Sequence, residues 1–330
     1  MAVETTYGVA VPVTRFFEAP VAFDYTPVKV QGTGTRPGKR LHRLERNVRV
    51  RTEASGTTDV EVGTAGFGIL LKAVLGAVTS AQVSPGPPAV HQHVFTLTAN
   101  DYLDSYTIQG VVPTLGSGAS LPQTFVGCMA QSMELTASEG ETLKASVSWG
   151  AKDMLTSEAA AVASYPTSDL FTFVHGEVVV KDAGTLTIPS GTALASVTAG
   201  TDVALSAVKS FSTKIDNGLD TAGYNLGGGG KRSRKQALGN RTVTGQMTVE
   251  LTDAKVRDAY MLQKPLQVLL TFTNGDAVLQ IVLPSVLLGG GIPKSNGGDV
   301  ITVDASYEAF DSVFAPHPIW VVYRSTDTTP

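Results

Sequence analysis

One stretch of the chain, residues 241–262, combines a strand pattern with a helix pattern and therefore constrains the fold most. Apolar or small residues alternate with polar ones over 243–251, and this period of two is typical of a half-buried β-strand. Thr252 and Asp253 follow as candidate helix caps, and residues 254–262 have the spacing of a short amphipathic helix. The stretch predicts one strand followed directly by one short helix.

The same order of patterns occurs earlier in the chain. Three positions correspond at a constant offset of 189: Gly56 to Gly245, Val60 to Val249 and Glu61 to Glu250. The apolar run 65–76 then takes the place of the helix. The chain thus contains two strand-then-helix units with matching register.

Two later matches follow in the same order, at smaller offsets. Gln109–Pro113 matches Gln280–Pro284 at an offset of 171, and Ser148-Trp149 matches Ser306-Tyr307 at an offset of 158. The shrinking offset implies extra residues in the first copy, where Gly/Pro/Ser-rich runs mark loops that accept insertions. Chance similarity between generic strands would not preserve order, register and loop placement together. We therefore predict one fold repeated in tandem.

The predicted fold class is mainly β, with a duplicated β-sandwich or barrel and one short α-helix in each copy. The expected parts are an N-terminal arm (1–27), a first copy (28–153), a linker with an extra hairpin (154–205), a second copy (206–311) and a C-terminal tail (312–330). The arm carries aromatic residues such as Phe16 and Phe23, which dock on a neighbour or pack on the chain's own barrel. The apolar centre of the tail, 319–323, predicts an added strand on its own barrel or on a neighbour.

Composition excludes several classes of protein. The net charge of −4 marks neither a nucleic-acid binder nor an acidic tail, and the single cysteine, Cys128, excludes an internal disulfide. The N-terminal residues lack an apolar export signal, and the most apolar run, 66–78, contains Lys72 and is too short to span a bilayer. We expect a protein that is made in a cytoplasm and has no membrane partner.

Two basic, glycine-rich segments precede the matching strands, at 36–51 and 227–241. Neither contains interleaved aromatic residues for stacking on single-stranded nucleic acid, and the second lacks the Ser or Thr of a P-loop. We expect exposed loops that meet an acidic surface on another subunit. A nucleic-acid patch and a merely solvated loop are the alternatives. The candidate inter-subunit residues are Arg36, Lys39, Arg40, Arg43, Lys231, Arg232, Arg234 and Lys235.

Signatures of catalysis are missing from the sequence. No GxSxG or HExxH motif occurs, and His91 and His93 have no cysteine or carboxylate close by in the sequence, so we expect them in a surface loop. We predict no catalytic, cofactor or metal site, and a protein that is not an enzyme.

Several segments together resemble the major tail tube protein of long-tailed bacteriophages, and the resemblance spans nearly the whole chain. They are ETTYG (4–8), GTRPGKR (34–40), GFGILLKAVLG (66–76), CMAQSMELTASEGETLKASVSW (128–149), FSTKIDNGL (211–219) and NRTVTG (240–245). The resemblance implies a β-sandwich or barrel that assembles as stacked rings into a hollow tube in the virion tail, through which phage DNA passes into the host.

What the resemblance implies for assembly can be stated further. Tube proteins of this kind place six copies of the fold around the axis, so two copies per chain favour a trimeric, pseudo-hexameric ring over a hexamer. The partners would be other copies of the chain, tail proteins such as the tape measure, tail terminator and distal tail, and duplex DNA bound without sequence specificity. Dense Lys and Arg would hold DNA, so we expect both basic loops to point away from the bore, towards the next ring.

Three other functions compete with this one. The inner tube of a contractile tail is the closest variant. A secreted β-rich adhesin or carbohydrate-binding module, and a nucleic-acid-binding protein that uses both basic loops, belong to other classes.

Overall fold

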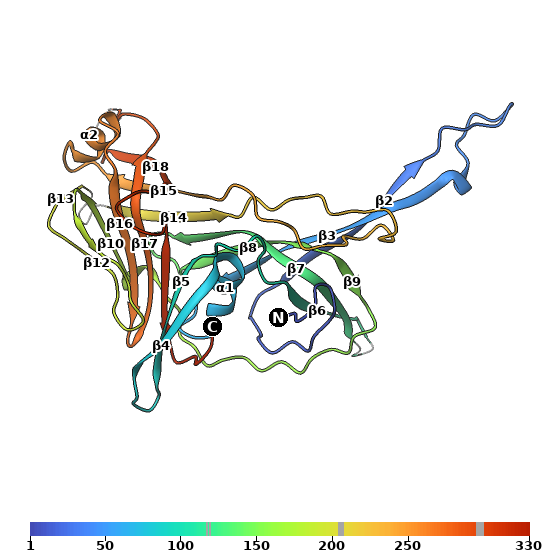
Figure 1. Cartoon of the computed structure of the whole chain (residues 1–330), viewed down its shortest axis with the longest axis horizontal. Helices are drawn as coiled ribbons and strands as arrows, with labels where there is room; N and C mark the ends of the chain where they lie inside the picture. The colour runs from blue at the N-terminus through green and yellow to red at the C-terminus, as the bar shows by residue number, and fades with distance from the viewer. Residues whose placement is uncertain (117, 119, 204–207, 295–299) are drawn as a thin grey trace.

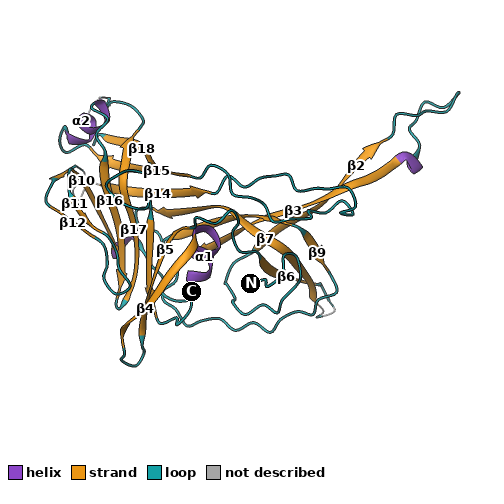
Figure 2. Ribbon diagram, viewed as in Figure 1, coloured by secondary structure: helices purple, strands orange, loops and turns teal. Residues whose placement is uncertain are grey.

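The computed structural model describes residues 1–116, 118, 120–203, 208–294 and 300–330, and this part is mainly β-structure, as the sequence predicted (Figures 1 and 2). Its first elements are β1 (Ala2–Val3), β2 (Val21–Gln31), a 3-10 helix (Leu44–Arg46), β3 (Asn47–Glu61), α1 (Gly68–Leu75), β4 (Gly76–Ser84), β5 (Val90–Leu97), β6 (Tyr106–Pro113), β7 (Ser120–Ala137), β8 (Lys144–Ala151) and β9 (Asp153–Leu155). The others are a 3-10 helix (Phe173–His175), β10 (Gly176–Asp182), β11 (Thr185–Thr187), β12 (Ser196–Thr198), β13 (Thr201–Asp202), β14 (Val208–Asp216), β15 (Thr242–Glu250), α2 (Lys255–Met261), β16 (Leu266–Asn274), β17 (Ala277–Leu288), β18 (Thr302–Ala309) and β19 (Trp320–Ser325). No described helix is long and apolar enough to cross a lipid bilayer.

One antiparallel sheet, the long sheet, runs through both halves of the chain. Its strand order is β2-β3-β8-β7-β14-β15-β18, and the end of β17 pairs with the end of β18. The two halves meet where Phe211–Asp216 of β14 pair with Ser132–Ala137 of β7. The first and second halves of the sequence therefore share a single hydrogen-bonded surface.

A second layer covers one face of the long sheet. Behind the second half its order is β10-β16-β17-β19-β5-β4, and behind the first half it is β1-β6-β7-β9. Strands β7 and β17 belong to both layers, because each pairs with a second-layer strand and then with β8 or β18. The C-terminal tail is a strand of the chain's own fold, since β19 lies between β17 and β5.

The core lies between the two layers. One cross-strand row of the long sheet, Val147, Met133, Ile215 and Val243, is buried throughout. Each such apolar side chain contributes about 1.5–3 kcal/mol by leaving water. This row crosses the boundary between the halves, so the core is continuous from one half to the other.

The two helices occupy matching places but differ in burial. In α1 every residue except Lys72 is buried, and Gly76 ends the helix at φ +87°, a conformation that suits glycine. In α2 only Val256 and Ala259 are buried. The predicted cap of α2 is wrong in its residue, since the N-cap is Ala254 without a side-chain cap bond, although the preceding Asp253 carboxylate accepts a 2.8 Å hydrogen bond from the backbone N–H of Lys255.

The strand registers repeat between the halves. Strand β3 lies between β2 and β8, and β15 lies between β14 and β18. Gly56 pairs with Trp149, and Gly245 pairs with Tyr307, so the offsets of 189 and 158 align both partners of each pair. The outer parts of the proposed duplication therefore correspond strand for strand.

The middle match between Gln109–Pro113 and Gln280–Pro284 is wrong. Gln109 lies on β6, which pairs with β7 and β1, whereas Gln280 lies on β17, which pairs with β16 and reaches β18. By its neighbours β17 corresponds to β7, and β16 corresponds to β6. An apolar strand that contains a proline is a generic pattern, and the hairpin β4–β5 is the extra part that shifts the sequence numbering.

The N-terminal arm packs on its own chain. Phe17, Phe23 and Tyr25 lie against the core, and the ring centroid of Phe23 is 4.7 Å from that of Phe125. Strand β2 already begins at Val21, inside the range expected for the arm. Of the two roles that the aromatic residues left open, packing on the chain's own fold is the one observed.

Candidate assembly surfaces

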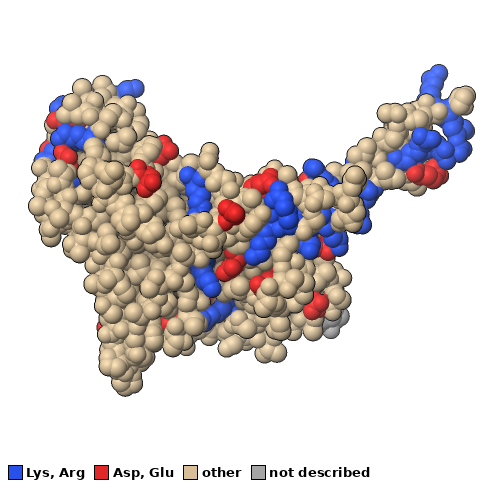
Figure 3. Space-filling view, in the orientation of Figure 1, with Lys and Arg blue, Asp and Glu red and all other residues tan. Residues whose placement is uncertain are grey.

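The first basic segment forms the end of a long hairpin. Strands β2 and β3 extend beyond the body of the molecule (Figure 1), and Lys and Arg side chains gather at their far end (Figure 3). We call residues 32–46 the hairpin tip. Arg36, Lys39 and Arg40 are exposed there, and among the described residues none of them forms an ion pair. Arg43 pairs with the neighbouring Glu45 at 3.3 Å.

The hairpin tip is also apolar. Leu41 is 83% exposed and Leu44 is 84% exposed, so the tip presents two large apolar side chains beside its cations. Exposed apolar side chains bordered by cations are typical of a surface that binds another molecule. The tip therefore has the composition of a contact surface.

The second basic segment, 227–241, is part of the loop between β14 and β15, residues 217–241, and this loop lies against the first half of its own chain. We call it the second loop. The Lys231 ammonium forms an ion pair with Asp153, and the backbone carbonyl of Gly230 accepts a 2.8 Å hydrogen bond from the N–H of Thr52. The Lys235 ammonium donates to the carbonyl of Leu103 at 3.2 Å. These bonds tie the second half of the chain to the first.

An aromatic residue that the sequence analysis did not single out organises the second loop. The guanidinium groups of Arg232 and Arg51 lie 5.5 and 5.4 Å from the ring centroid of Tyr224, within range of cation–π attraction. Arg234 pairs with Asp220, and the pKa of this carboxyl is lowered first by the N–H of Ala222 and then by Arg234. All four predicted basic residues of the second loop thus have partners within the chain, and their contact with another subunit stays a prediction.

The uncovered face of the long sheet is polar and mainly acidic. Cross-strand pairing places Asp59, Ser146, Glu134, Lys214, Thr244 and Glu308 in one continuous row across six strands. Strand alternation could have revealed this face from the sequence, since these residues lie between the apolar ones. The other carboxylates of this face include Asp24, Glu53, Glu61, Asp216, Glu250 and Asp304, and its other cations include Lys144, Lys209 and, where β3 enters the hairpin, Arg49 and Arg51.

The acidic face is held in place by short hydrogen bonds. The hydroxyl of Ser146 donates to Asp59 at 2.6 Å, and that of Thr248 donates to Asp304 at 2.8 Å. The Lys209 ammonium lies 3.0 Å from Glu250. Hydroxyl groups and a lysine therefore hold several of these carboxylates in fixed positions on the face.

The predicted surface loop around the histidines is wrong. His91 and His93 lie on β5, and His93 is fully buried, with one ring nitrogen 2.7 Å from the Ser80 hydroxyl and the other 2.9 Å from the carbonyl of Asp327. Burial lowers the pKa of His93. Among the described residues no three His, Cys, Asp or Glu side chains are grouped to hold a metal ion.

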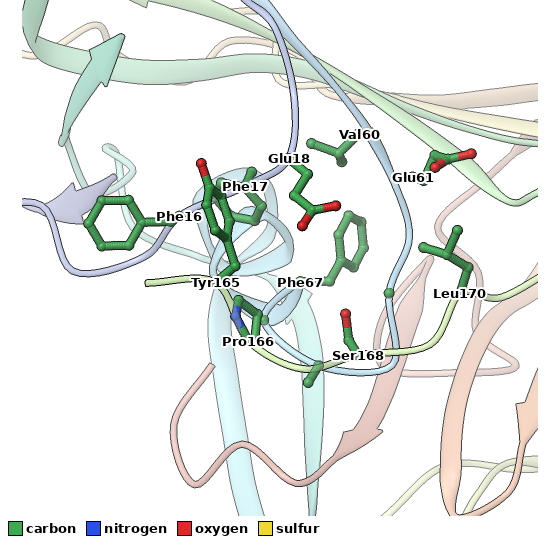
Figure 4. Close-up of a pocket in the computed structure, with 13 residues that line it drawn as sticks. Phe16, Phe17, Glu18, Val60, Glu61, Phe67, Tyr165, Pro166, Ser168 and Leu170 are labelled. Atoms are coloured by element: carbon green, nitrogen blue, oxygen red, sulfur yellow. The ribbon is translucent and has the colours of Figure 1, made fainter. Parts of the chain in front are cut away.

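A cavity of about 270 Å³ lies between the N-terminal arm and the linker (Figure 4). The rings of Phe17, Phe67 and Tyr165 line it, and Glu18 and Glu61 are its titratable residues. Within this described lining no histidine, lysine or cysteine accompanies the carboxylates. Such a cavity offers an apolar wall and two carboxylates.

Comparison with known protein families gives a match. The model of the phage tail tube protein family matches residues 1–309. No curated protein matches the chain. Because the family match covers nearly the whole chain and meets the β-rich, two-layered fold described above, the chain belongs to the phage tail tube protein family and is a structural component of the virion tail.

Proposed function

We propose that the chain is the ring-forming subunit of a long, non-contractile phage tail tube, and that three chains form each ring. The observation that carries this proposal is the ladder between β7 and β14, which joins the two halves edge to edge. One chain is therefore equivalent to two neighbouring units of a larger ring. Three chains supply the six units that tubes of this family place around the axis.

The two ends of the long sheet support closure of the ring. Strand β2 pairs with β3 alone, and residues 302–306 of β18 pair only with β15 among the described strands. Unpaired sheet edges promote association with other strands. Joining the β2 edge of one chain to the β17–β18 edge of the next satisfies both edges and closes a barrel.

The acidic face of the long sheet suits the bore. Duplex DNA carries about one negative charge per 1.7 Å of its axis, and lysines or arginines that neutralise these charges bind it. A wall formed by the row from Asp59 to Glu308 repels the DNA backbone and keeps a layer of water against it. The DNA then passes through without being held.

Stacking follows from the asymmetry of each ring. A ring has two different faces, so contact between rings is heterologous and propagates as a filament. The two ends of such a tube require partners of their own, for which the tape measure, tail terminator and distal tail proteins are the candidates. In this proposal the chain binds and assembles but catalyses no reaction.

Ring size can be measured directly. We expect native mass spectrometry of assembled protein to give a species of three times 34.4 kDa, about 103 kDa, and negative-stain images to show stacked rings. A ring of twice that mass would replace the trimer by a hexamer. A stable monomer that forms no ring under any assembly condition would contradict the proposed function.

The bore assignment has a separate test. The variant Glu134→Lys adds a cation to the acidic face, and Asp276→Lys adds one to the exposed turn between β16 and β17. We expect tubes of the first variant to retain DNA at low salt and to release it as salt rises, and virions that carry it to eject DNA more slowly. Tubes of the second should match the wild type. Equal DNA retention by both variants would place the acidic face away from the bore.

A further inference from the structure

The contact between the second loop and the first half provides a template for a contact between chains. Within one chain, Lys231 pairs with Asp153, the carbonyl of Gly230 accepts a hydrogen bond from the N–H of Thr52, and Arg51 of the first half lies over the Tyr224 ring of the second loop. Asp153 is 6% exposed, and Lys231 is its ion-pair partner. The joint is made by a Gly-Lys-Arg sequence placed against a carboxylate just after a strand of the long sheet.

The repeated registers identify the equivalent positions in the other half. The offset of 158 between β8 and β18 carries Asp153 onto Asp311. The hairpin tip has the same Gly-Lys-Arg sequence at residues 38–40 that the second loop has at residues 230–232. The tip connects β2 to β3, and the second loop connects β14 to β15, which are the corresponding strands of the two halves. The first half therefore carries its own copy of the joining segment.

Within the part of the chain that the structure describes, Lys39 and Arg40 of this copy form no ion pair. The second loop lies over the first half, whereas the hairpin tip extends beyond the body (Figure 1). Gly38 has no atom within 4 Å of the place a Cβ would take, so even the turn of the tip is open. Its counterpart Gly230 lies against Val50 and Arg51. The Gly-Lys-Arg sequence of the second loop therefore contacts the other half of the chain, whereas that of the hairpin tip is exposed.

The surroundings of Asp311 are opposite to the tip in charge and, like the tip, carry exposed apolar side chains. Asp311 is exposed and forms no ion pair with any described residue. Beside it lie Phe310, Val313 and Phe314, which are 40%, 99% and 66% exposed. We call these four residues the acidic-apolar patch. A carboxylate among exposed apolar side chains complements lysine and arginine flanked by exposed Leu41 and Leu44.

We propose that the hairpin tip of one chain binds the acidic-apolar patch of the adjacent chain in the same ring. Lys39 then faces the partner's Asp311 as Lys231 faces Asp153 within a chain. Arg40 lies over the partner's Phe310 or the partner's Phe314, and Leu41 and Leu44 cover the partner's Val313. The occupant of the patch is a second copy of this chain, and the contact rests on the proposed function as a ring-forming tube subunit.

The position of this contact differs from the one expected from the sequence. A tip that bound the next ring would join rings into a column. A tip that repeats the joint between the halves instead joins neighbours around the axis, because that joint spans adjacent strands of the long sheet. Contacts between neighbours in one ring close after one turn around the axis, whereas contacts between successive rings continue along the tube.

Disulfide trapping distinguishes these arrangements. The double variant Lys39→Cys/Asp311→Cys is assembled, oxidised and separated under denaturing, non-reducing conditions; the native Cys128 is buried and should not react. We expect a ladder of linked chains that ends at the number of chains in one ring. The matched control, Lys231→Cys/Asp153→Cys, should close its disulfide within one chain and remain a monomer on the gel.

Each other result has a defined meaning. An open-ended ladder would show that the tip joins successive rings, and would overturn this inference while leaving the tube function intact. Ring assembly with a closed control disulfide but no linked chains would overturn it in the same way. A wild-type protein that forms no rings would overturn the proposed function itself.

Charge reversal supplies a second measurement. We expect Lys39→Glu and Asp311→Lys each to reduce the assembled fraction roughly tenfold at low salt, and their combination to restore most of it. Circular dichroism of the monomers checks that each variant is folded. Equal assembly by the single variants and the wild type would contradict the contact.

Discussion

Replacement of Gly245 by alanine tests whether the repeated strand registers depend on a close approach of side chain to backbone. A Cβ at Gly245 would lie 2.1 Å from the carbonyl oxygen of Ser212 and 2.3 Å from Cζ of Tyr307. The Tyr307 ring has little freedom to move. It is 3% exposed and stacks on Phe211, and its hydroxyl donates a 2.8 Å hydrogen bond to the carbonyl of Ser212.

The cost of the substitution follows from these contacts. Overpacking of a core costs about 1–3 kcal/mol. If the Tyr307 ring moves away, its buried hydroxyl loses its partners, which costs about 1–3 kcal/mol more. The lower entropy of the unfolded alanine chain offsets about 0.4–1 kcal/mol. We therefore expect Gly245→Ala to lower the free energy of unfolding by about 3 kcal/mol.

Urea unfolding of the monomer, followed by the fluorescence of Trp149 and Trp320, measures this change. Gly291→Ala is the matched control, because nothing lies within 4 Å of its Cβ position, and we expect it to change stability by less than about 0.5 kcal/mol. Gly56→Ala should behave like Gly245→Ala, since its Cβ would lie 2.3 Å from Cγ of Phe23. If Gly245→Ala is no more destabilising than Gly291→Ala, the reasoning is refuted.

Three further substitutions test other contacts. His93 has a lowered pKa because it is buried, so below its ordinary pKa of 6.5 the unfolded chain binds a proton that the folded chain does not. Stability should therefore fall between pH 7.5 and 5.5, and thermal unfolding of His93→Asn should show a smaller fall; an unchanged slope would exclude His93 as its source. Lys231→Ala leaves the carboxylate of Asp153 without its partner, and we expect urea unfolding to show a loss of about 1–3 kcal/mol, against no measurable change for Lys39→Ala in the monomer. Asn217→Ala removes two 3.1 Å hydrogen bonds from the side-chain amide to the carbonyls of Val74 and Ala130, and an expected loss of about 2 kcal/mol by the same assay would be contradicted by a value near zero.

The sequence predicted the features that depend on neighbouring residues. The period of two over residues 243–251 identified β15, and the fixed offsets aligned Gly56 with Gly245 and Trp149 with Tyr307, which the structure pairs across strands in the same way in both halves. It failed at the middle match because β6 and β17 have similar apolar character and only their neighbours distinguish them. These neighbours are set by pairing between residues far apart in the sequence, which a short stretch of sequence does not reveal.

Long-range contacts also explain the other differences. His93 lies shortly after a proline pair, which is typical of a loop. In the structure β5 pairs with β19, and the carbonyl oxygen of Asp327 contacts the His93 ring. The two basic segments have nearly the same composition, but Asp153 and Thr52 engage only the second loop. Whether a charged loop is bound or free depended on what the fold places beside it.

Tandem duplication gives the two kinds of joint in the proposed ring different properties. The joint between β7 and β14 forms within one chain, where the linker keeps the partners at a high effective concentration. The joint between chains uses the edge beyond β17, and there Gly289, Gly290 and Gly291 stand where β7 continues as Gln131, Ser132 and Met133. Glycine loses the most backbone freedom on ordering, so this edge gains regular structure only when a partner strand supplies its hydrogen bonds. We infer that the joint between β7 and β14 forms as each chain folds, and that the joint beyond β17 forms only when a second chain binds. This order favours complete rings over disordered aggregates.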